Sequence, residues 1–342
     1  MRITFKPMVA AAGIAALFTA AVITPALAEI MKPANYPTRP ITILFCFGKA
    51  GGSAQSIQAL QGPASKIMGV KVNMLSKPGG GGLNCLPDFA QTPADGYTIL
   101  QHIDALPAKY AAGATDLNPA KDLEPLLIMN VAPSGLYIRG GDKRFLTNGK
   151  PDFDKVLAYA RSGEGKLVVS NINVPMELVT MSVLEKHFGF KAKQVLFAKP
   201  AQRYGAVIGG KLDILLEQPG DVSKHVEAGK LAPVLSIWPE RFKIAPDTKA
   251  TGPDYGLKWS PLLRFRGLFV KKGTPKEIVT YLQAVFKEAY NTKEHQAFIK
   301  RKSLDIVESY RSPADAKKEL EGAIATYAKV FKELGQKVRP GL

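Results

Sequence analysis

The sequence predicts an α/β protein of two lobes, each built on a mostly parallel β-sheet flanked by helices. Short apolar runs alternate with stretches whose apolar residues recur at helical spacing, which is typical of parallel strands joined by helices. This alternation occurs in two groups, one on each side of the segment "PSGLYIRG" (133–140). The chain has 342 residues, 46% of them hydrophobic, so it is large enough to bury two such cores.

The first 28 residues have the pattern of a secretory signal peptide. Arg2 and Lys6 precede the apolar run Val9–Ile23, and the small-residue site Ala26–Ala28 follows. The alternative is a retained membrane anchor, but the run is short for a bilayer and rich in Ala and Gly. We therefore expect cleavage before Glu29 and export of the mature chain.

The first group of elements begins with the near-continuous apolar run "ITILFCF" (41–47), which is typical of a strand covered on both faces. Apolar residues at helical spacing follow in "SAQSIQALQGPASKIMG" (53–69). A second strand is predicted for "VKVNMLS" (70–76), and the glycine turn "KPGGGGLNCLPDFAQ" (77–91) leads into a helix. Turn residues then precede a third strand, "GYTILQHI" (96–103).

The second group repeats the same alternation of strand and helix. The predicted elements are strand 165–172, helix 175–189, strand 193–198, helix 201–210, strand 211–218, and a helix and strand within 225–238. Long Lys-rich amphipathic helices between Thr274 and Leu334 should cover the first lobe, with their lysines in solvent.

The order of the elements also predicts where the chain passes between the lobes. We expect crossings near Leu136–Arg139 and Pro261–Gly267. Residues 29–137 and 262–342 would then form the first lobe, and residues 138–261 the second.

The composition excludes several classes of function. The formal net charge is +17, but export and the lack of zinc-finger or RNA-binding signatures argue against a nucleic-acid partner. A basic surface would instead draw an anionic ligand toward a cleft. The four histidines lack zinc-ligand spacing, so we expect neither a metal nor a cofactor. Because the sequence has no nucleophile elbow, HExxH helix or supported Cys–His pair, we do not expect an enzyme.

The turn "GKAGGS" after the first strand is a candidate anion site. Gly51 and Gly52 let the backbone approach a ligand, and Ser53 could cap the next helix, whose first amides carry partial positive charge. The segment is no nucleotide loop, since GK[ST] does not follow the glycines. A single turn of this kind is more often a tight connection, but a second glycine turn follows the next strand, which favours a ligand.

Cys46 and Cys85 lie at the ends of two predicted neighbouring strands. In an exported protein this pair could form a disulfide or remain as two buried thiols, and the sequence leaves both states open.

Several segments together resemble a known family. "YPTRPITILFCFGKAGGSAQ", "ADGYTIL" and "GTPKEIV" are similar to the solute-binding receptors of tripartite tricarboxylate transporters, the Bug family, and the match runs from Tyr36 to nearly the C-terminus. The resemblance implies a monomeric, two-lobed periplasmic binding protein of type II, shaped like a Venus flytrap. It would capture a di-, tri- or aromatic carboxylate and deliver it to membrane transporter subunits. The alternative is a sensory receptor that presents its closed form to a membrane-bound histidine kinase.

The resemblance also implies which residues bind the ligand. The family's anion turn corresponds here to Phe47, Lys49, Ala50, Gly51, Gly52 and Ser53, and its second glycine loop includes Gly80. The opposing loop of the family usually reads Ser-x-Gly-x-Gly-Ser. This chain keeps Ser170, but Asn171 and Asn173 replace the glycines, which should shift the specificity. The strand ends add the cleft candidates His102, Asp104, Lys199, Arg203, Glu217 and Gln218.

Overall fold

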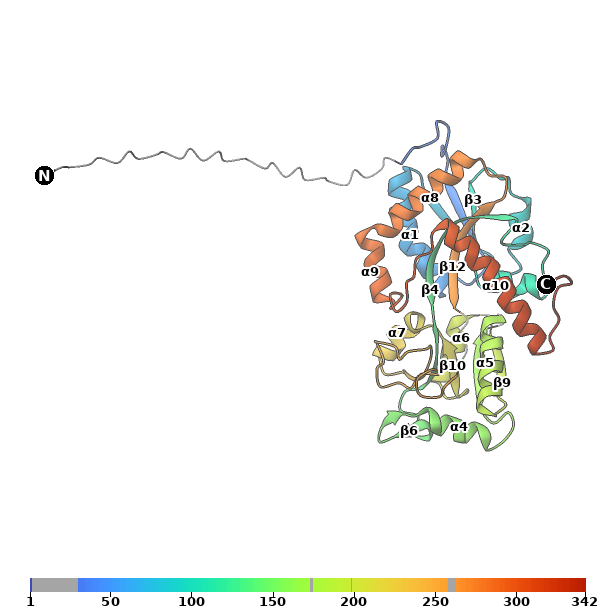
Figure 1. Cartoon of the computed structure of the whole chain (residues 1–342), viewed down its shortest axis with the longest axis vertical. Coiled ribbons are helices and arrows are strands. Elements are labelled where there is room, and N and C mark those ends of the chain that lie inside the picture. The colour runs from blue at the N-terminus through green and yellow to red at the C-terminus, as the bar shows by residue number, and fades with distance from the viewer. Residues whose placement is uncertain (2–29, 173–174, 198, 258–262) are drawn as a thin grey trace. The chain divides into compact units, whose positions relative to one another are not determined.

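The structure is a computed structural model that describes residues 1, 30–172, 175–197, 199–257 and 263–342 (Figure 1). Three expectations fall wholly or partly outside the described residues: the signal peptide, the role of Asn173, and the second crossing between the lobes. Lys32–Leu342 form one compact unit, which contains both sheets.

The first sheet has the spatial order β2-β1-β3-β12-β4. Its strands are β1 (Ile41–Phe45), β2 (Val72–Ser76), β3 (Thr98–Ile103), β4 (Leu123–Ala132) and β12 (Arg264–Lys271). β1 pairs in parallel with β2 and β3, whereas β12 is antiparallel to both β3 and β4. The sheet is therefore mostly parallel, with β12 running against the other four strands.

The second sheet has the spatial order β11-β5-β10-β8-β9. Its strands are β5 (Ser134–Arg139), β8 (Val168–Ile172), β9 (Lys193–Phe197), β10 (Ile214–Glu217) and β11 (Leu231–Ile237). β8 pairs in parallel with β9 and β10, and β5 is antiparallel to β10 and β11. This sheet too is mostly parallel, with β5 as the reversed strand. A short ladder of β6 (Leu146–Thr147) and β7 (Lys150–Pro151) lies outside both sheets.

Helices complete the two lobes. Those of the first lobe are α1 (Gly52–Met68), α2 (Leu86–Gln91), α3 (Ala105–Ala111), α8 (Lys276–Asn291), α9 (Lys293–Arg301) and α10 (Pro313–Glu333). Those of the second are the 3-10 helix η1 (Lys143–Phe145), α4 (Phe153–Arg161), α5 (Pro175–Phe188), α6 (Pro200–Ile208) and α7 (Pro219–Glu227). As the sequence predicted, the C-terminal helices pack on the first sheet, α8 against α1 and β4 and α10 against α3 and β4 (Figure 1).

The packing of α10 shows how amphipathic spacing places these helices. Leu320, Ile324, Tyr327 and Phe331 recur every three or four residues and are all buried. Tyr327 and Phe331 belong to an apolar cluster with Ala108 of α3 and with α5 of the second lobe. The C-terminal helix therefore also helps to hold α5 beside the first lobe. Among the described residues, no helix combines the length and the apolarity needed to cross a membrane.

The connection between the sheets differs slightly from the expectation. β4 ends at Ala132 and β5 begins at Ser134, so the chain passes from the first sheet to the second at Pro133. The sequence predicted this crossing near Leu136–Arg139, because the second group of elements was expected to begin only after the segment 133–140, whereas Ser134–Arg139 already form β5. The predicted division into residues 29–137 and 262–342 for the first lobe and 138–261 for the second stays a prediction.

Candidate functional site

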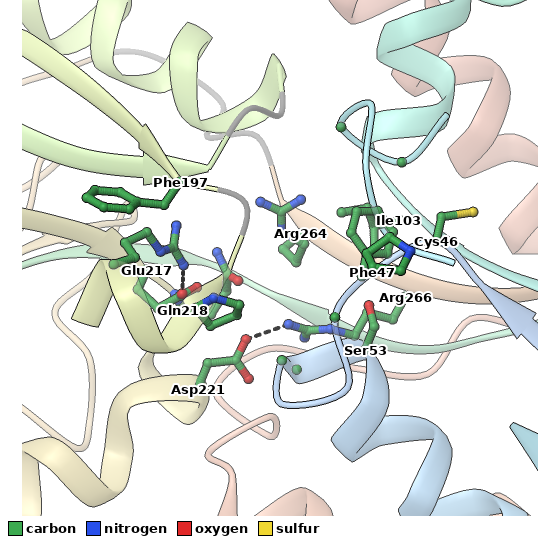
Figure 2. A pocket seen from close by; sticks show the side chains of 18 of the residues that line it. Cys46, Phe47, Ser53, Ile103, Phe197, Glu217, Gln218, Asp221, Arg264 and Arg266 are labelled. Atoms are coloured by element: carbon green, nitrogen blue, oxygen red, sulfur yellow. Dashed lines mark hydrogen bonds and ion pairs between the residues drawn. The ribbon is translucent and has the colours of Figure 1, made fainter. Parts of the chain in front are cut away.

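A cavity of about 330 Å³ is lined by loops from both lobes. The first lobe contributes the turn after β1 and the glycine loop after β2, and the second contributes the ends of β9 and β10 and the starts of α6 and α7. Figure 2 shows Phe197, Glu217, Gln218 and Asp221 on one side and Phe47, Ser53 and Arg266 on the other. The carboxyl ends of parallel strands are the usual place for ligands in α/β sheets.

The turn after β1 presents the start of α1 to the cavity. The N-cap residue is Gly51, with φ −88° and ψ 174°, and Gly52 and Ser53 are the first two residues of the helix. The expectation that Ser53 caps the helix is thus wrong, because the helix begins one residue before it. Since glycine has no side chain with which to cap, the first amides of α1 are available to an anion in the cavity.

Gly52 lies directly against an ion pair from two other elements. A Cβ atom built on Gly52 would lie 2.1 Å from Nη2 of Arg266 and 2.3 Å from Oδ2 of Asp221. Such distances are far below van der Waals contact, so any larger residue would displace both side chains. Glycine at this position thus leaves room for the Arg266–Asp221 ion pair beside the start of α1.

The second glycine loop, Gly79–Gly82, has positive φ at all four residues, a conformation that glycine adopts without strain. His102 supports this loop from behind. Its Nε2 donates to the carbonyl oxygen of Gly82 at 2.8 Å, and its Nδ1 accepts from the amide of Ile103 at 2.9 Å. Burial lowers the pKa of His102, which therefore stays neutral near pH 7. His102 is thus a support for the loop and lies outside the cavity lining.

A disulfide joins the two glycine segments. Cys46 follows β1 and Cys85 precedes α2, their Cα atoms are 5.2 Å apart, and both side chains are fully buried. The bond lies in the apolar core of the first lobe, next to Leu86 and Phe89. Of the two states that the sequence left open, the structure contains the disulfide.

Buried charges form a network along the second-lobe wall. Nη1 of Arg203 lies 2.9 and 3.1 Å from the two carboxylate oxygens of Glu177, and Nη2 pairs with Glu217. Glu217 also accepts from the hydroxyl of Tyr204 at 2.7 Å and from the amide of Gln218 at 2.9 Å. The side chains of Arg203, Glu177 and Glu217 are each at most 3% exposed. Such pairing is what makes buried charges tolerable.

Two arginines of β12 extend this network between the lobes. Arg264 pairs with Asp104 at 2.8 Å and with Glu177 of α5 at 3.2 Å. Burial raises the pKa of Asp104, although Arg264 acts in the opposite direction. Arg266 pairs with Asp221 of α7 at 2.5 Å (Figure 2). Each of these arginines therefore links the first sheet to a helix of the second lobe.

Eight of the site residues predicted from sequence line the cavity: Phe47, Gly51, Gly52, Ser53, Gly80, Arg203, Glu217 and Gln218. Among the other described candidates, three are exposed and four are buried away from the lining. The exposed ones are Lys49, Ala50 and Lys199, and the buried ones are His102, Asp104, Ser170 and Asn171. The role of each residue in binding stays a prediction.

Three residues that line the cavity were not predicted from the sequence: Asp221, Arg264 and Arg266. A signal for the two arginines was present in "RFRGLFV", where charged residues alternate with apolar ones at the start of a strand. Alternating residues share one face of a strand, so both arginines had to point the same way. Asp221 follows Gln218 by three residues and gives no comparable signal.

Ser170 and Asn171 are not among the residues that line the cavity. Nδ2 of Asn171 donates to Oε1 of Gln194 at 2.7 Å, and the hydroxyl of Ser170 lies 3.5 Å from the carbonyl oxygen of Arg203. In the described part of the chain, no group of three or more His, Cys, Asp or Glu side chains is placed to hold a metal ion.

A family model and several known proteins match this chain over most of its length. The family model "Tripartite tricarboxylate transporter family receptor" matches residues 57–335. A Cupriavidus necator protein, named "UPF0065 protein in gbd 5′region", is 29% identical over 298 residues, which is 85% of this chain and 86% of that protein. Protein BugT of Bordetella pertussis is 22% identical over 92% of this chain and 95% of its own length.

Solved structures share the fold. MatC of Rhodopseudomonas palustris, solved with bound malate, has a TM-score of 0.75 at 19% identity and covers 86% of this chain and 99% of its own. The R. palustris protein Rpa4515, solved with adipate, has a TM-score of 0.77 at 19% identity and covers 88% and 99%. The periplasmic binding protein BugD has a TM-score of 0.76 at 19% identity and the same coverage. These likenesses confirm the predicted two-lobed α/β fold.

Proposed function

The chain belongs to the tripartite tricarboxylate transporter receptor family, and from this premise we propose that it captures a small organic carboxylate between its lobes and delivers it to a membrane transporter. Membership confirms the resemblance seen in the sequence. Because the family consists of receptors, membership also confirms the expectation that the chain is not an enzyme. Receptors of this kind work outside the cytoplasm, so we propose export through the N-terminal signal peptide into the periplasm.

One observation carries the proposal: the uncapped start of α1 opens into a cavity between the lobes. The amides of Gly52 and Ser53 belong to the first turn of that helix, where partial positive charge favours an anion. Arg266 lies directly beside this turn, and within the described structure its Nε is buried without a hydrogen-bond partner. A carboxylate at the turn could therefore accept hydrogen bonds from backbone amides and from a guanidinium.

The second lobe supplies the opposite wall through Phe197, Gln218 and the charged residues of α6 and α7. A ligand that touches both walls adds contacts between the lobes, so it favours the closed arrangement over any open one. The relatives with malate and adipate show that proteins of this fold hold small dicarboxylates. For this chain, the carboxylate class is part of the proposal.

The decisive experiment replaces Gly52 with Val. The new side chain would occupy the space of the Arg266 and Asp221 head groups and would keep the ligand away from the amides. We expect Gly52→Val to lose carboxylate binding in a calorimetric titration. Gly62→Val is the matched control, because Gly62 lies in the same helix and a Cβ there has nothing within 4 Å. Binding by Gly52→Val as tight as that of the parent would show that the turn does not hold the anion.

The ligand itself can be found with a thermal-shift screen of mono-, di- and aromatic carboxylates. Because a ligand binds only the folded protein, a concentration one hundred times its Kd adds about 2.7 kcal/mol to the free energy of unfolding. Neutral amides of the same acids are the matched controls and should leave the melting temperature unchanged. Equal shifts from acids and amides would reject the anion site.

A further inference from the structure

Each guanidinium that faces the cavity is already paired with a carboxylate of the protein. Arg203 pairs with Glu177 and Glu217, Arg264 with Asp104 and Glu177, and Arg266 with Asp221. Among the described residues, the network at this site thus contains three guanidinium groups and four carboxylates. The second-lobe wall therefore offers a ligand no unpaired guanidinium group among the described residues, although it contains Arg203.

Glu217 is the acidic side chain of this network that lies farthest from solvent while still lining the cavity. It is 2% exposed, and hydrogen bonds from Tyr204, Arg203 and the Gln218 amide fix both of its oxygens. Glu217 lies on the second-lobe side, whereas the start of α1 lies on the first-lobe side (Figure 2). A ligand whose carboxylate binds at the start of α1 would therefore place its other end near Glu217.

A second ligand carboxylate at that end would be buried beside a fixed carboxylate. Both Nη groups of Arg203 are already engaged by Glu177 and Glu217. A second ligand carboxylate would therefore have to share this guanidinium with two fixed carboxylates, or displace one of them and leave that charge buried without compensation. A neutral ligand end meets no such penalty. Nε of Arg203 is buried and has no partner among the described residues, so it can donate to a neutral hydroxyl or carbonyl oxygen.

The rest of the lining suits an uncharged ligand body. Phe47, Ile103, Leu196 and Phe197 contribute apolar surface to the cavity, and the side chain of Leu196 is 45% exposed. An exposed leucine at the edge of a cavity is available to bury alkyl or aryl groups of a ligand.

We infer that the cavity selects ligands with a single carboxylate, and that Glu217 excludes dicarboxylates of the same length. This inference rests on the proposed function, because it assumes a carboxylate at the start of α1. It sets this chain apart from the relatives solved with malate and adipate, which are both dicarboxylates. Glu217 is then a specificity-determining residue that acts through its charge.

The test compares acids of matched size by calorimetric titration of the purified protein. The pairs are butyrate and succinate, hexanoate and adipate, and 4-methylbenzoate and terephthalate. We expect the monocarboxylate of at least one pair to bind, with a Kd at least tenfold lower than that of its dicarboxylate partner. A dicarboxylate that binds as tightly as its partner, or more tightly, would overturn the inference and leave the proposed function intact. If none of the six acids binds but a dicarboxylate from the thermal-shift screen does, the inference is overturned and the proposed function stands; if no carboxylate of that screen binds, both fail.

Variants assign the effect to Glu217. Glu217→Gln keeps the shape and removes the charge, so the ratio of dicarboxylate Kd to monocarboxylate Kd should fall at least fivefold. Asp305→Asn makes the same change of net charge at an exposed position outside the cavity lining, and the ratio should not change. An unchanged ratio in Glu217→Gln would overturn the assignment to this residue. The wild-type ratio tests the exclusion of dicarboxylates even if the variant does not fold.

Discussion

Replacement of Arg264 by Met should destabilise the protein strongly, although Met fills much of the same volume. The Arg264 side chain is 2% exposed and pairs with Asp104 at 2.8 Å and Glu177 at 3.2 Å. After the substitution Glu177 still has Arg203, whereas Asp104 keeps, among the side chains that the structure describes, the hydrogen bond from the Tyr327 hydroxyl at 3.2 Å. A buried carboxylate would therefore lose its cationic partner.

The magnitude follows from that loss. Removal of one partner from a buried ion pair costs about 3–5 kcal/mol. The lower end applies here, because one of the two carboxylates keeps a partner. For a folded unit of roughly 310 residues, the entropy of unfolding is about 0.65 kcal/mol/K, so a cost of about 3 kcal/mol lowers the Tm by about 5 °C.

Thermal unfolding followed by circular dichroism measures this change. Arg241→Met is the matched control, because Arg241 pairs with Asp254 at the surface and its side chain is 44% exposed. Such a pair should contribute less than about 1 kcal/mol. Asp104→Asn in the Arg264→Met background removes the stranded charge and should restore part of the lost stability. If Arg264→Met costs no more than Arg241→Met, the reasoning about the buried network is refuted.

Three further predictions concern the supporting structure. The Cys46–Cys85 disulfide should leave no alkylatable thiol in unreduced protein, and its reduction should cost about 3–4 kcal/mol; two labelled thiols before reduction would reject it. Because burial lowers the pKa of His102 below its usual 6.5, the unfolded chain binds more protons, and the free energy of unfolding should fall from pH 7 to 5. For this group the free energy of unfolding changes by at most about 1.4 kcal/mol per pH unit. His102→Gln should reduce the dependence on pH, and the same dependence in the variant as in the parent would contradict the prediction. Gly220→Ala should destabilise by roughly 1–3 kcal/mol in denaturant unfolding, since its Cβ would lie 1.8 Å from a backbone oxygen. Gly205→Ala is the control, because a Cβ atom on Gly205 would have no atom within 4 Å. Equal free energies of unfolding for the two variants would contradict the close approach at Gly220.

Much of the fold could be predicted because strand and helix patterns are local. The apolar run of β1, the helical spacing in α1 and the glycine turn between them lie within 28 consecutive residues, Ile41–Met68. The alternation repeats through α7 and β11, and its division into two groups predicted the two lobes. β4 and β12 were not predicted as strands. β4 runs into β5 with only Pro133 between them, and in the described chain β12 is followed by helices alone, so neither is followed by the helix and strand of the alternating pattern.

By itself, the sequence determined the α/β class, the family, and the place of the glycine turn at Gly51 and Gly52, which lines the cavity. Only the tertiary structure decided which charges face the cavity. Arg264 and Asp104 are 160 residues apart, and Arg266 and Asp221 are 45 apart. Their pairing depends on the packing of β12 against the second lobe. Backbone periodicity is encoded in neighbouring residues, whereas the burial and pairing of a charge depend on every segment that surrounds it, so the polarity of the site emerges only when the lobes are assembled.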